Sequence, residues 1–342
     1  MSYRYIGNKT RLLPTLIQVL SDGLGRGAVV ADLMCGTGSV ASALRENGFR
    51  VVASDIMTFA CLHARVRLTM AQPPAFERLA LGYDSVLHEL NRLPPIKGYF
   101  WREHSPAGAP SAGVRPRAYF TPENAARIDA ISGQLREWHA AKLLIGKVWA
   151  LLRHDLVLAA NRVANIAGTY GHFRSKWSSS SLAPLQMRPT QFSMGGSTDH
   201  IVRQGAAELV AHGLRADLCY LDPPYTKRQY AANYHIPETL ARCDEPPAIG
   251  VSGLRPWRDQ YSDFCSKVRV RDSFRAVISR MDCPRFLVSY SEDGLLTRVE
   301  LEGLLREFGT LEVIEIPARR FRSNESPLPR EITEYVFALD RR

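Results

Sequence analysis

Residues 220–225 read YLDPPY and are the part of the sequence best suited to chemistry. An apolar strand ends at Asp222, the prolines Pro223 and Pro224 fix the backbone, and the ring of Tyr225 follows. Proline lacks an N–H, so an amino group could give one hydrogen to Asp222 and the other to an uncontested main-chain carbonyl. Tyr225 offers a ring face for a planar base. A rigid loop with a capping aspartate and a core tyrosine is the alternative, but open sheets bind ligands at strand carboxyl ends.

A second pattern suggests a nucleoside site. The strand Val29–Met34, which contains Asp32, runs into a loop with Gly36 and Gly38. Glycines let a ligand approach the backbone, and Asp55 ends the next strand about twenty residues later, where nucleoside-binding folds place a carboxylate on ribose hydroxyls. The third glycine of the dinucleotide fingerprint is missing, which counts against NAD. Because tight turns also use such glycines, the loop alone leaves a purely structural role open.

Strands and helices alternate around both patterns. Strands are predicted at 29–34, 50–54, 216–221, 286–290, 311–316 and 334–339, and helices at 39–47, 56–70, 265–281 and 295–308. Such alternation predicts an α/β fold with a Rossmann-like, doubly wound parallel sheet.

The stretch 84–200 breaks this rhythm and predicts an inserted, mostly helical domain, and the excess of basic residues within it suggests that it recognises DNA. It is rich in Pro, Gly and Ser near both ends, and one clear helix begins inside it, with Thr121 as N-cap and Pro122 in the first turn. The expected organisation is a cofactor-binding part at 1–83, the inserted segment, and a catalytic part at 201–342.

Charge points to an anionic partner. The net charge is +10, and residues 91–200 hold 14 Lys and Arg against 6 Asp and Glu, with no acidic residue from 156 to 198. A basic zone of this kind favours nucleic acid, although a merely soluble basic surface fits the charge equally well. The cations of the acid-free stretch, expected to contact DNA phosphates, are Arg162, Arg174, Lys176 and Arg188.

The rest of the composition argues against several other classes. No apolar run approaches the ~20 residues needed to span a membrane, and the first residues lack the apolar region of a signal peptide. Six cysteines lie far apart without a C-x-x-C pair, which fits reduced thiols in the cytoplasm better than disulfides or a zinc site. No histidines show the H-E-x-x-H spacing, so no metal is predicted.

Several blocks together resemble one family. D-P-P-Y after a strand, with a glycine loop before it, is similar to the amino-methylating DNA methyltransferases. The block Tyr5-Ile6-Gly7-Asn8-Lys9 and the long insert before D-P-P-Y resemble the alpha-class, Dam-like order. Because stretches 119–124, 168–171 and 228–235 resemble the same group, the resemblance covers essentially the whole chain. It implies a methyltransferase fold that transfers a methyl group from S-adenosylmethionine to the 6-amino group of an adenine in double-stranded DNA. A cognate restriction endonuclease is an optional partner.

The resemblance also assigns residues by position. Those expected to bind the cofactor are Tyr5, Lys9, Asp32, Gly36, Gly38, Asp55 and Asp222. Those expected to hold the flipped adenine are Asp222, Pro223, Pro224 and Tyr225, with Phe321 as a second stacking face. Tyr5 could instead pack against the first helix, Lys9 could be a solvated charge, and Phe321 is equally compatible with a core position.

Two points leave alternatives open. Residues 204–207 read QGAA where many relatives carry G-D-A, which puts an acidic contact to the cofactor adenine in doubt, with Glu208 as a nearby substitute. The Asp222 corner accepts any planar amino group, so a cytosine 4-amino group, an RNA adenine or a glutamine amide would also fit. Cytosine-modifying relatives usually carry Ser in place of the Asp, and the basic insert disfavours glutamine. A non-catalytic DNA-binding subunit is less compatible with an intact Asp222 and glycine loop.

Overall fold

The computed structural model describes residues 5–7, 9–319 and 331–342. They fold into two compact units, each built from three stretches of chain. The helical unit contains the described residues of Met1–Ile6, with Met70–Ser193 and Ala231–Asp259. The sheet unit contains the described residues of Gly7–Thr69, Met194–Tyr230 and Gln260–Arg342. Most of the segment predicted as an insert therefore lies in the helical unit, which residues 231–259 also join.

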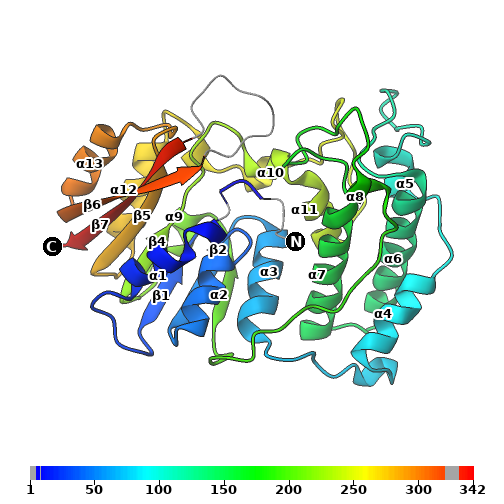
Figure 1. Ribbon diagram of the computed structural model, residues 1–342, viewed down its shortest axis with the longest axis horizontal. Coiled ribbons are helices and arrows are strands. Elements are labelled where there is room, and N and C mark those ends of the chain that lie inside the picture. Colours follow the sequence, from blue (N-terminus) through cyan, green and yellow to red (C-terminus); the bar gives the residue numbers. More distant parts are fainter. Residues whose placement is uncertain (1–4, 8, 320–330) are drawn as a thin grey trace. The chain divides into compact units, whose positions relative to one another are not determined.

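The sheet unit contains a seven-stranded sheet in the order β3-β2-β1-β4-β5-β7-β6 (Figure 1). Its strands are β1 (Val29–Asp32), β2 (Arg50–Asp55), β3 (Ile201–Gln204), β4 (Leu218–Leu221), β5 (Arg285–Ser291), β6 (Gly309–Arg319) and β7 (Glu331–Arg341). The pairs from β3 to β5 are parallel, whereas β7 runs antiparallel to both β5 and β6. The predicted α/β sheet is confirmed, with one correction: the last two strands form an antiparallel pair.

Helices cover both faces of this sheet. On one face α1 (Leu13–Ser21), α2 (Ser39–Glu46) and α3 (Thr58–Thr69) pack against inward side chains of the central strands. On the other face the cover is α9 (Ala207–Val210), α12 (Val270–Arg280) and α13 (Arg298–Arg306). Strands enclosed on both sides must be apolar on both, and all four residues of β4 are buried.

The helical unit contains more helices than the one predicted clearly. They are α4 (Tyr83–Arg92), α5 (Tyr99–His104), α6 (Pro122–Ala140), α7 (Gly146–Val163), α8 (Ser179–Leu182) and α11 (His235–Arg242). The predicted helix is α6, and its N-cap is confirmed, because the Thr121 hydroxyl accepts the Asn124 N–H at 3.2 Å. The shorter helices of the chain are α10 (Tyr230–Asn233) and the 3-10 turns Lys9–Arg11, Glu77–Leu79, Arg258–Gln260 and Asp263–Cys265.

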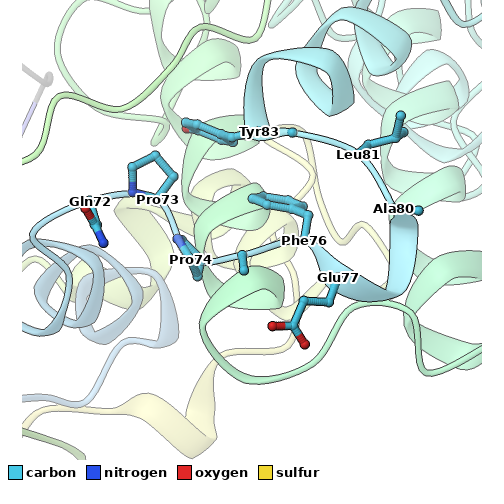
Figure 2. Close-up of a pocket in the computed structure, with 10 residues that line it drawn as sticks. Gln72, Pro73, Pro74, Phe76, Glu77, Ala80, Leu81 and Tyr83 are labelled. Carbon is cyan, nitrogen blue, oxygen red and sulfur yellow. The ribbon is translucent and has the colours of Figure 1, made fainter.

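Two further properties of the described residues bear on function. No helix among them is long and apolar enough to cross a membrane. The helical unit has a surface pocket lined by Gln72, Pro73, Pro74 and neighbours up to Tyr83, shown in Figure 2. The rings of Phe76 and Tyr83 stack there with centroids 5.6 Å apart. None of the residues predicted to do chemistry lines this pocket.

Candidate active site

Three predicted carboxylates lie where parallel strands of the sheet end. Asp32 and Asp55 are the last residues of β1 and β2, and Asp222 follows β4 directly. Strand β1 lies between β2 and β4, with Asp32 opposite Tyr220 of β4 and Ala53 of β2. Because parallel strands share the edge at which they end, the pairing brings residues far apart in the sequence to the same place.

The glycine loop after β1 is closed by Asp55. One carboxylate oxygen accepts the Gly36 N–H at 2.9 Å, and the other accepts the Met57 N–H at 2.9 Å. Gly38 has a φ of +72°, and a Cβ there would lie 3.2 Å from the Cα of Ala64 on α3. The sequence therefore needs glycine for both the backbone angle and the close approach of the helix.

Asp32 is the unusual carboxylate of the edge. It is 1% exposed, and neither of its oxygens has a hydrogen-bond partner among the described residues. Burial raises its pKa well above the ordinary value, and the charges of Asp222 and Asp55 raise it further. The backbone N–H groups of Met34 and of Ala41 on α2 oppose the rise in pKa, but neither makes a hydrogen bond to the carboxylate. A buried acid without a partner is costly in a folded protein, which indicates a ligand that would complete it.

The D-P-P-Y corner is held by two contacts to one oxygen of Asp222. The Tyr225 hydroxyl donates to Oδ1 of Asp222 at 2.5 Å, and Nζ of Lys9 lies 3.2 Å from the same oxygen. Lys9 also contacts the Tyr225 hydroxyl and lies 4.8 Å from the ring centroid. Among the described residues, no donor reaches the carbonyl of Pro223 or Pro224.

Glu334 on β7 completes this corner, and sequence analysis missed it. Its Oε2 lies 3.2 Å from Nζ of Lys9 and 3.4 Å from the Tyr225 hydroxyl. Strand β7 pairs with β5, which lies beside β4, so the antiparallel pairing of β7 with β5 places Glu334 at the corner. The available signal was an acid just ahead of the apolar run Tyr335–Leu339, at a position that a buried strand rarely gives to a charge.

The corner carries one positive and two negative charges. Burial alone would lower the pKa of Lys9, but Asp222 and Glu334 outweigh it and raise the pKa overall. Burial raises the pKa of Asp222, with Lys9 and the Tyr225 hydroxyl opposing the rise. Burial and the neighbouring Asp222 likewise raise the pKa of Glu334, which Lys9 offsets in part. With all three ionised, the corner keeps a net negative charge.

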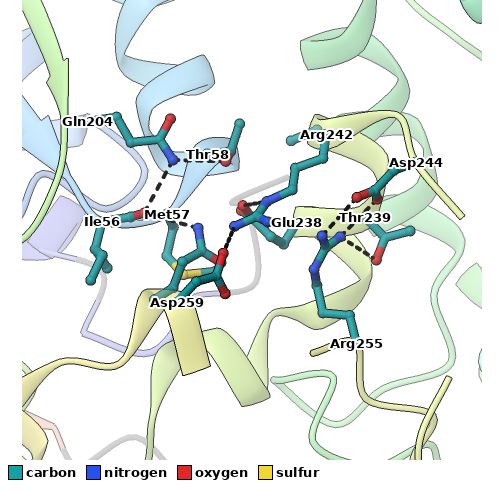
Figure 3. Close-up of polar contacts among 12 residues, drawn as sticks. Ile56, Met57, Thr58, Gln204, Glu238, Thr239, Arg242, Asp244, Arg255 and Asp259 are labelled. Atoms are coloured by element: carbon teal, nitrogen blue, oxygen red, sulfur yellow. Dashed lines mark hydrogen bonds and ion pairs between the residues drawn. The ribbon is translucent and has the colours of Figure 1, made fainter. Parts of the chain in front are cut away.

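Other predicted site residues have different surroundings. Tyr5 belongs to the helical unit, where its ring stacks on Tyr234 at 4.8 Å between centroids. Phe321 lies outside the described residues. Gln204 ends β3, and its side-chain amide donates to the Thr58 hydroxyl at 3.0 Å and to the Ile56 carbonyl at 3.4 Å, as Figure 3 shows. Gln204, which stands where many relatives carry an acidic residue nearby, is therefore hydrogen-bonded to the start of α3.

The four predicted phosphate contacts differ in exposure. Arg174, Lys176 and Arg188 are exposed, whereas Arg162 is half-buried on α7. Burial lowers the pKa of Arg162, Arg188 lowers it further, and Asp155 opposes the shift. Arg162 is therefore the least accessible of the four cations, and Arg174, Lys176 and Arg188 are open to a partner.

Three stretches noted in the sequence meet inside the helical unit. The Tyr119 hydroxyl lies 2.7 Å from the Tyr170 carbonyl, and the Tyr170 N–H donates to the Asn233 carbonyl at 2.8 Å. A ring nitrogen of His235 lies 2.9 Å from the same Tyr170 carbonyl. These hydrogen bonds hold parts of the stretches 119–124, 168–171 and 228–235 against one another.

One protein family and several known proteins are similar to this chain. The family model described as D12 class N6 adenine-specific DNA methyltransferase matches residues 5–303. The chain is similar to Type II methyltransferase M.FokI of Planomicrobium okeanokoites, with 32% identity over 99% of this chain and 52% of that protein. It is also similar to Modification methylase StsI of Streptococcus sanguinis, with 28% identity over the same shares of the two chains. Type II methyltransferase M.NlaIII of Neisseria lactamica is 31% identical over 98% of this chain and 99% of its own length.

The chain therefore spans about half the length of M.FokI and StsI, and nearly all of M.NlaIII. The family model covers well over half of the chain and includes the glycine loop, the helical unit and the D-P-P-Y corner. The chain belongs to the D12 class N6 adenine-specific DNA methyltransferase family.

Proposed function

We propose that this chain is a site-specific DNA methyltransferase that methylates the exocyclic 6-amino group of adenine, with S-adenosylmethionine as the methyl donor. The observation that carries the proposal is the corner at the end of β4, where Lys9 and Tyr225 contact Asp222 and Glu334 contacts Lys9. It lies beside the partnerless carboxylate of Asp32 at the end of the neighbouring strand.

The corner offers acceptors suited to an amino group. Because Lys9 and Tyr225 both contact Oδ1 of Asp222, Oδ2 is the oxygen left for an incoming N–H. The Pro223 carbonyl is the natural acceptor for the second N–H. With both hydrogens engaged, the lone pair of the nitrogen withdraws from the ring and points outward. A nitrogen that gains a methyl group must lose one proton, and Asp222 would take it at Oδ2.

The residues of the edge also fit the cofactor. S-adenosylmethionine supplies a methyl group on a positively charged sulfur, and its methionine end carries an ammonium and a carboxylate. The carboxylate of Asp32 has no hydrogen-bond partner among the described residues, and a positively charged part of the cofactor would supply one. Asp55, whose carboxylate closes the glycine loop, is the proposed acceptor for the ribose hydroxyls. We place Tyr5, Gly36 and Gly38 in the same role, with Lys9 near the cofactor carboxylate.

DNA contact would come from the basic surface of the helical unit. Arg174, Lys176 and Arg188 are exposed there, in a stretch without acidic residues. An adenine amino group lies inside the duplex, so the base must be extruded at a cost of a few kcal/mol, which contacts with the backbone offset. Tyr225 and Phe321 are the proposed faces against which the extruded base stacks.

One experiment tests the function directly. The chain is incubated with tritiated S-adenosylmethionine and with duplex DNA, RNA or protein, and modified nucleosides are identified after digestion. Label recovered as N6-methyladenine from DNA is the expected result. Label found only in RNA adenine, in cytosine or in a glutamine side chain would show that this group, and not DNA adenine, is the methyl acceptor. Cofactor binding without transfer to any of these substrates would indicate a non-catalytic subunit.

The relatives also suggest a biological setting. M.FokI and M.NlaIII are type II methyltransferases by name, and StsI is a modification methylase. We therefore propose that the protein acts in the cytoplasm as the modifying half of a restriction–modification system, with a cognate endonuclease as partner. Sequencing modified bases in DNA from cells that express the chain would give the recognised site, and protection of that site from a matching endonuclease would test the pairing.

A further inference from the structure

The helical unit contains a short turn that presents apolar side chains to water. Between Ile249 and Leu254 the backbone closes on itself, and each N–H donates to the other residue's carbonyl at 2.8 Å. Within the turn, Val251 is 64% exposed, and Ile249 beside it is 56% exposed. Gly250 and Gly253 both have positive φ, at +69° and +67°. The tight reversal therefore pushes two β-branched side chains outward.

A fully buried arginine fixes the shape of this turn. The guanidinium of Arg117 donates to the carbonyls of Gly250 at 2.8 Å, Val251 at 3.1 Å and Ala248 at 3.3 Å. Its charge is balanced by Glu103, whose Oε2 lies 3.0 Å away and which is buried too. A Cβ on Gly253 would come within 2.8 Å of the Arg117 side chain. A buried ion pair costs desolvation, and here it organises a turn whose tip faces solvent.

The same turn is bonded to the basic stretch of the unit. The Ser252 hydroxyl donates to the Gly171 carbonyl at 2.8 Å, and the Tyr119 hydroxyl lies 3.1 Å from the Ser252 carbonyl. Gly171 belongs to a second reversal, in which Ile166 pairs with Phe173 in antiparallel fashion. The exposed Arg174 and Lys176 follow at once. The apolar tip is therefore hydrogen-bonded to a second turn, and two exposed cations follow that second turn in the sequence.

Packing among the described residues does not explain the exposed tip, since the side chains of Ile249 and Val251 lie largely in water. Valine and isoleucine have stiff side chains that lose little conformational freedom on contact. Proteins that distort DNA insert apolar side chains of this kind between base steps, while cations hold the phosphates. The positive charge beside the tip selects a polyanion over a neutral protein surface as the occupant.

We propose that the turn Ile249–Leu254 is a DNA wedge, in which Val251, supported by Ile249, inserts into the base stack while Arg174 and Lys176 contact the adjoining phosphates. The inference rests on the proposed function, because it takes duplex DNA as the substrate. Its specific content is that the wedge stabilises a broken stack. The contribution of Val251 should therefore be large when the target pair is intact and small when the pair is already disrupted.

The test compares two duplexes that carry the site identified by sequencing. One has the target adenine paired with thymine, and the other has it mispaired. Val251→Ser should lower kcat/KM on the paired duplex by about 10-fold. On the mispaired duplex, kcat/KM of the same variant should lie within about two-fold of the wild-type value, because a pair that is already open no longer needs the wedge. Val251→Leu keeps an apolar tip and should retain most activity on both. Val299→Ser changes an exposed valine on α13 of the sheet unit and serves as the matched control.

The outcomes separate the wedge from the function on which it rests. A wild-type chain that methylates the paired duplex, together with an unaffected Val251→Ser variant or one equally impaired on both duplexes, overturns the wedge alone. If sequencing finds no methylated site, and the wild-type chain methylates neither of two such duplexes of arbitrary sequence, the proposed function is overturned. In that case the affinities of the same variants for the two duplexes, measured by fluorescence anisotropy, still show whether loss of Val251 weakens binding of the paired duplex more than binding of the mispaired one. Unchanged melting temperatures would show that the variants fold.

Discussion

Lys9 and Glu334, which are 325 positions apart in the sequence, lie 3.2 Å from each other at the corner that follows β4. The same ammonium lies 3.2 Å from Asp222, so one cation is shared between two carboxylates. If Lys9 paired with Asp222 alone, the acceptor strength of that carboxylate would be largely neutralised. Glu334 takes part of the positive charge and leaves Asp222 electron-rich toward an amino group.

Replacing Glu334 tests this sharing of charge. Glu334→Gln should reduce methyl transfer by on the order of 10-fold, because Lys9 then pairs with Asp222 alone. It should also move the alkaline limb of the kcat/KM profile to lower pH, since Glu334 is one of the carboxylates that raise the Lys9 pKa. Glu334→Asp should recover part of the activity. The control is Glu312→Gln, an exposed glutamate on β6. A variant with reduced activity but an unmoved alkaline limb would mean that Glu334 is merely structural.

Asp222 is expected to be indispensable for transfer and dispensable for folding. Asp222→Asn should reduce single-turnover methyl transfer by on the order of 100-fold or more, because the amide accepts more weakly from the amino group and cannot take its proton. Asp282→Asn, at an exposed aspartate of the same unit, should behave like the wild type. Turnover at the wild-type rate by a folded Asp222→Asn protein would rule out this corner as the active site.

Asp32 should show opposite effects on stability and on cofactor binding. Removing its buried, partnerless charge with Asp32→Asn should stabilise the cofactor-free protein by on the order of 1 kcal/mol, because the cost of burying the charge and its repulsion by Asp222 and Asp55 are both relieved. Since the Asp32 pKa is raised, this gain should grow with pH. Affinity for S-adenosylmethionine should fall at the same time. Urea denaturation without cofactor and calorimetric titration measure the two effects, and a variant that loses stability would contradict the assignment.

The exposed cations of the helical unit should govern the salt dependence of DNA binding. Arg174→Ala combined with Lys176→Ala should flatten the slope of log K against log salt by up to about two units, because each phosphate contact contributes roughly 0.9. Binding to specific and unrelated DNA should weaken alike, with cofactor affinity unchanged. Arg215→Ala, at an exposed arginine of the sheet unit, is the control. An unaltered slope with unaltered specificity would show that these charges are only a solvated surface.

A buried aspartate should make the stability of the protein depend on pH. Burial raises the pKa of Asp155 to about 7, although its carboxylate accepts from the Thr190 and Tyr83 hydroxyls. The folded state therefore holds this proton more tightly than the unfolded chain, and its contribution to stability is present at low pH and lost as pH rises toward 7. Asp155→Asn should flatten the fall in unfolding free energy between pH 4.5 and about 7.5. Asp84→Asn, at an exposed position on α4, should keep the wild-type fall. An equal fall in Asp155→Asn would refute the assignment.

Local signals in the sequence were sufficient for the edge of the sheet. Asp32, Asp55 and Asp222 each end or follow an apolar run, and the fold of parallel strands then brings them together. Helix α6 was equally visible, because Thr121 caps it and its apolar residues repeat with the period of a helix.

The features that were missed depend on contacts distant in sequence. Glu334 reaches the corner only through the antiparallel pairing of β7 with β5. Strand β3 is four residues long and largely exposed, so it has no apolar pattern. Helix α7 is buried over much of its circumference, which hides the helical period. The place of residues 231–259 in the helical unit likewise depends on packing and not on local pattern.

The assembly of one corner from residues 9, 222 and 334 also sets an order of events during synthesis. The ribosome releases the glycine loop first and the D-P-P-Y corner second, so a nascent chain can pair Lys9 with Asp222 before β7 exists. Glu334, the second carboxylate, reaches Lys9 only when β7 has paired between β5 and β6. The arrangement in which two carboxylates share one ammonium therefore exists only in a chain whose sheet already includes β7.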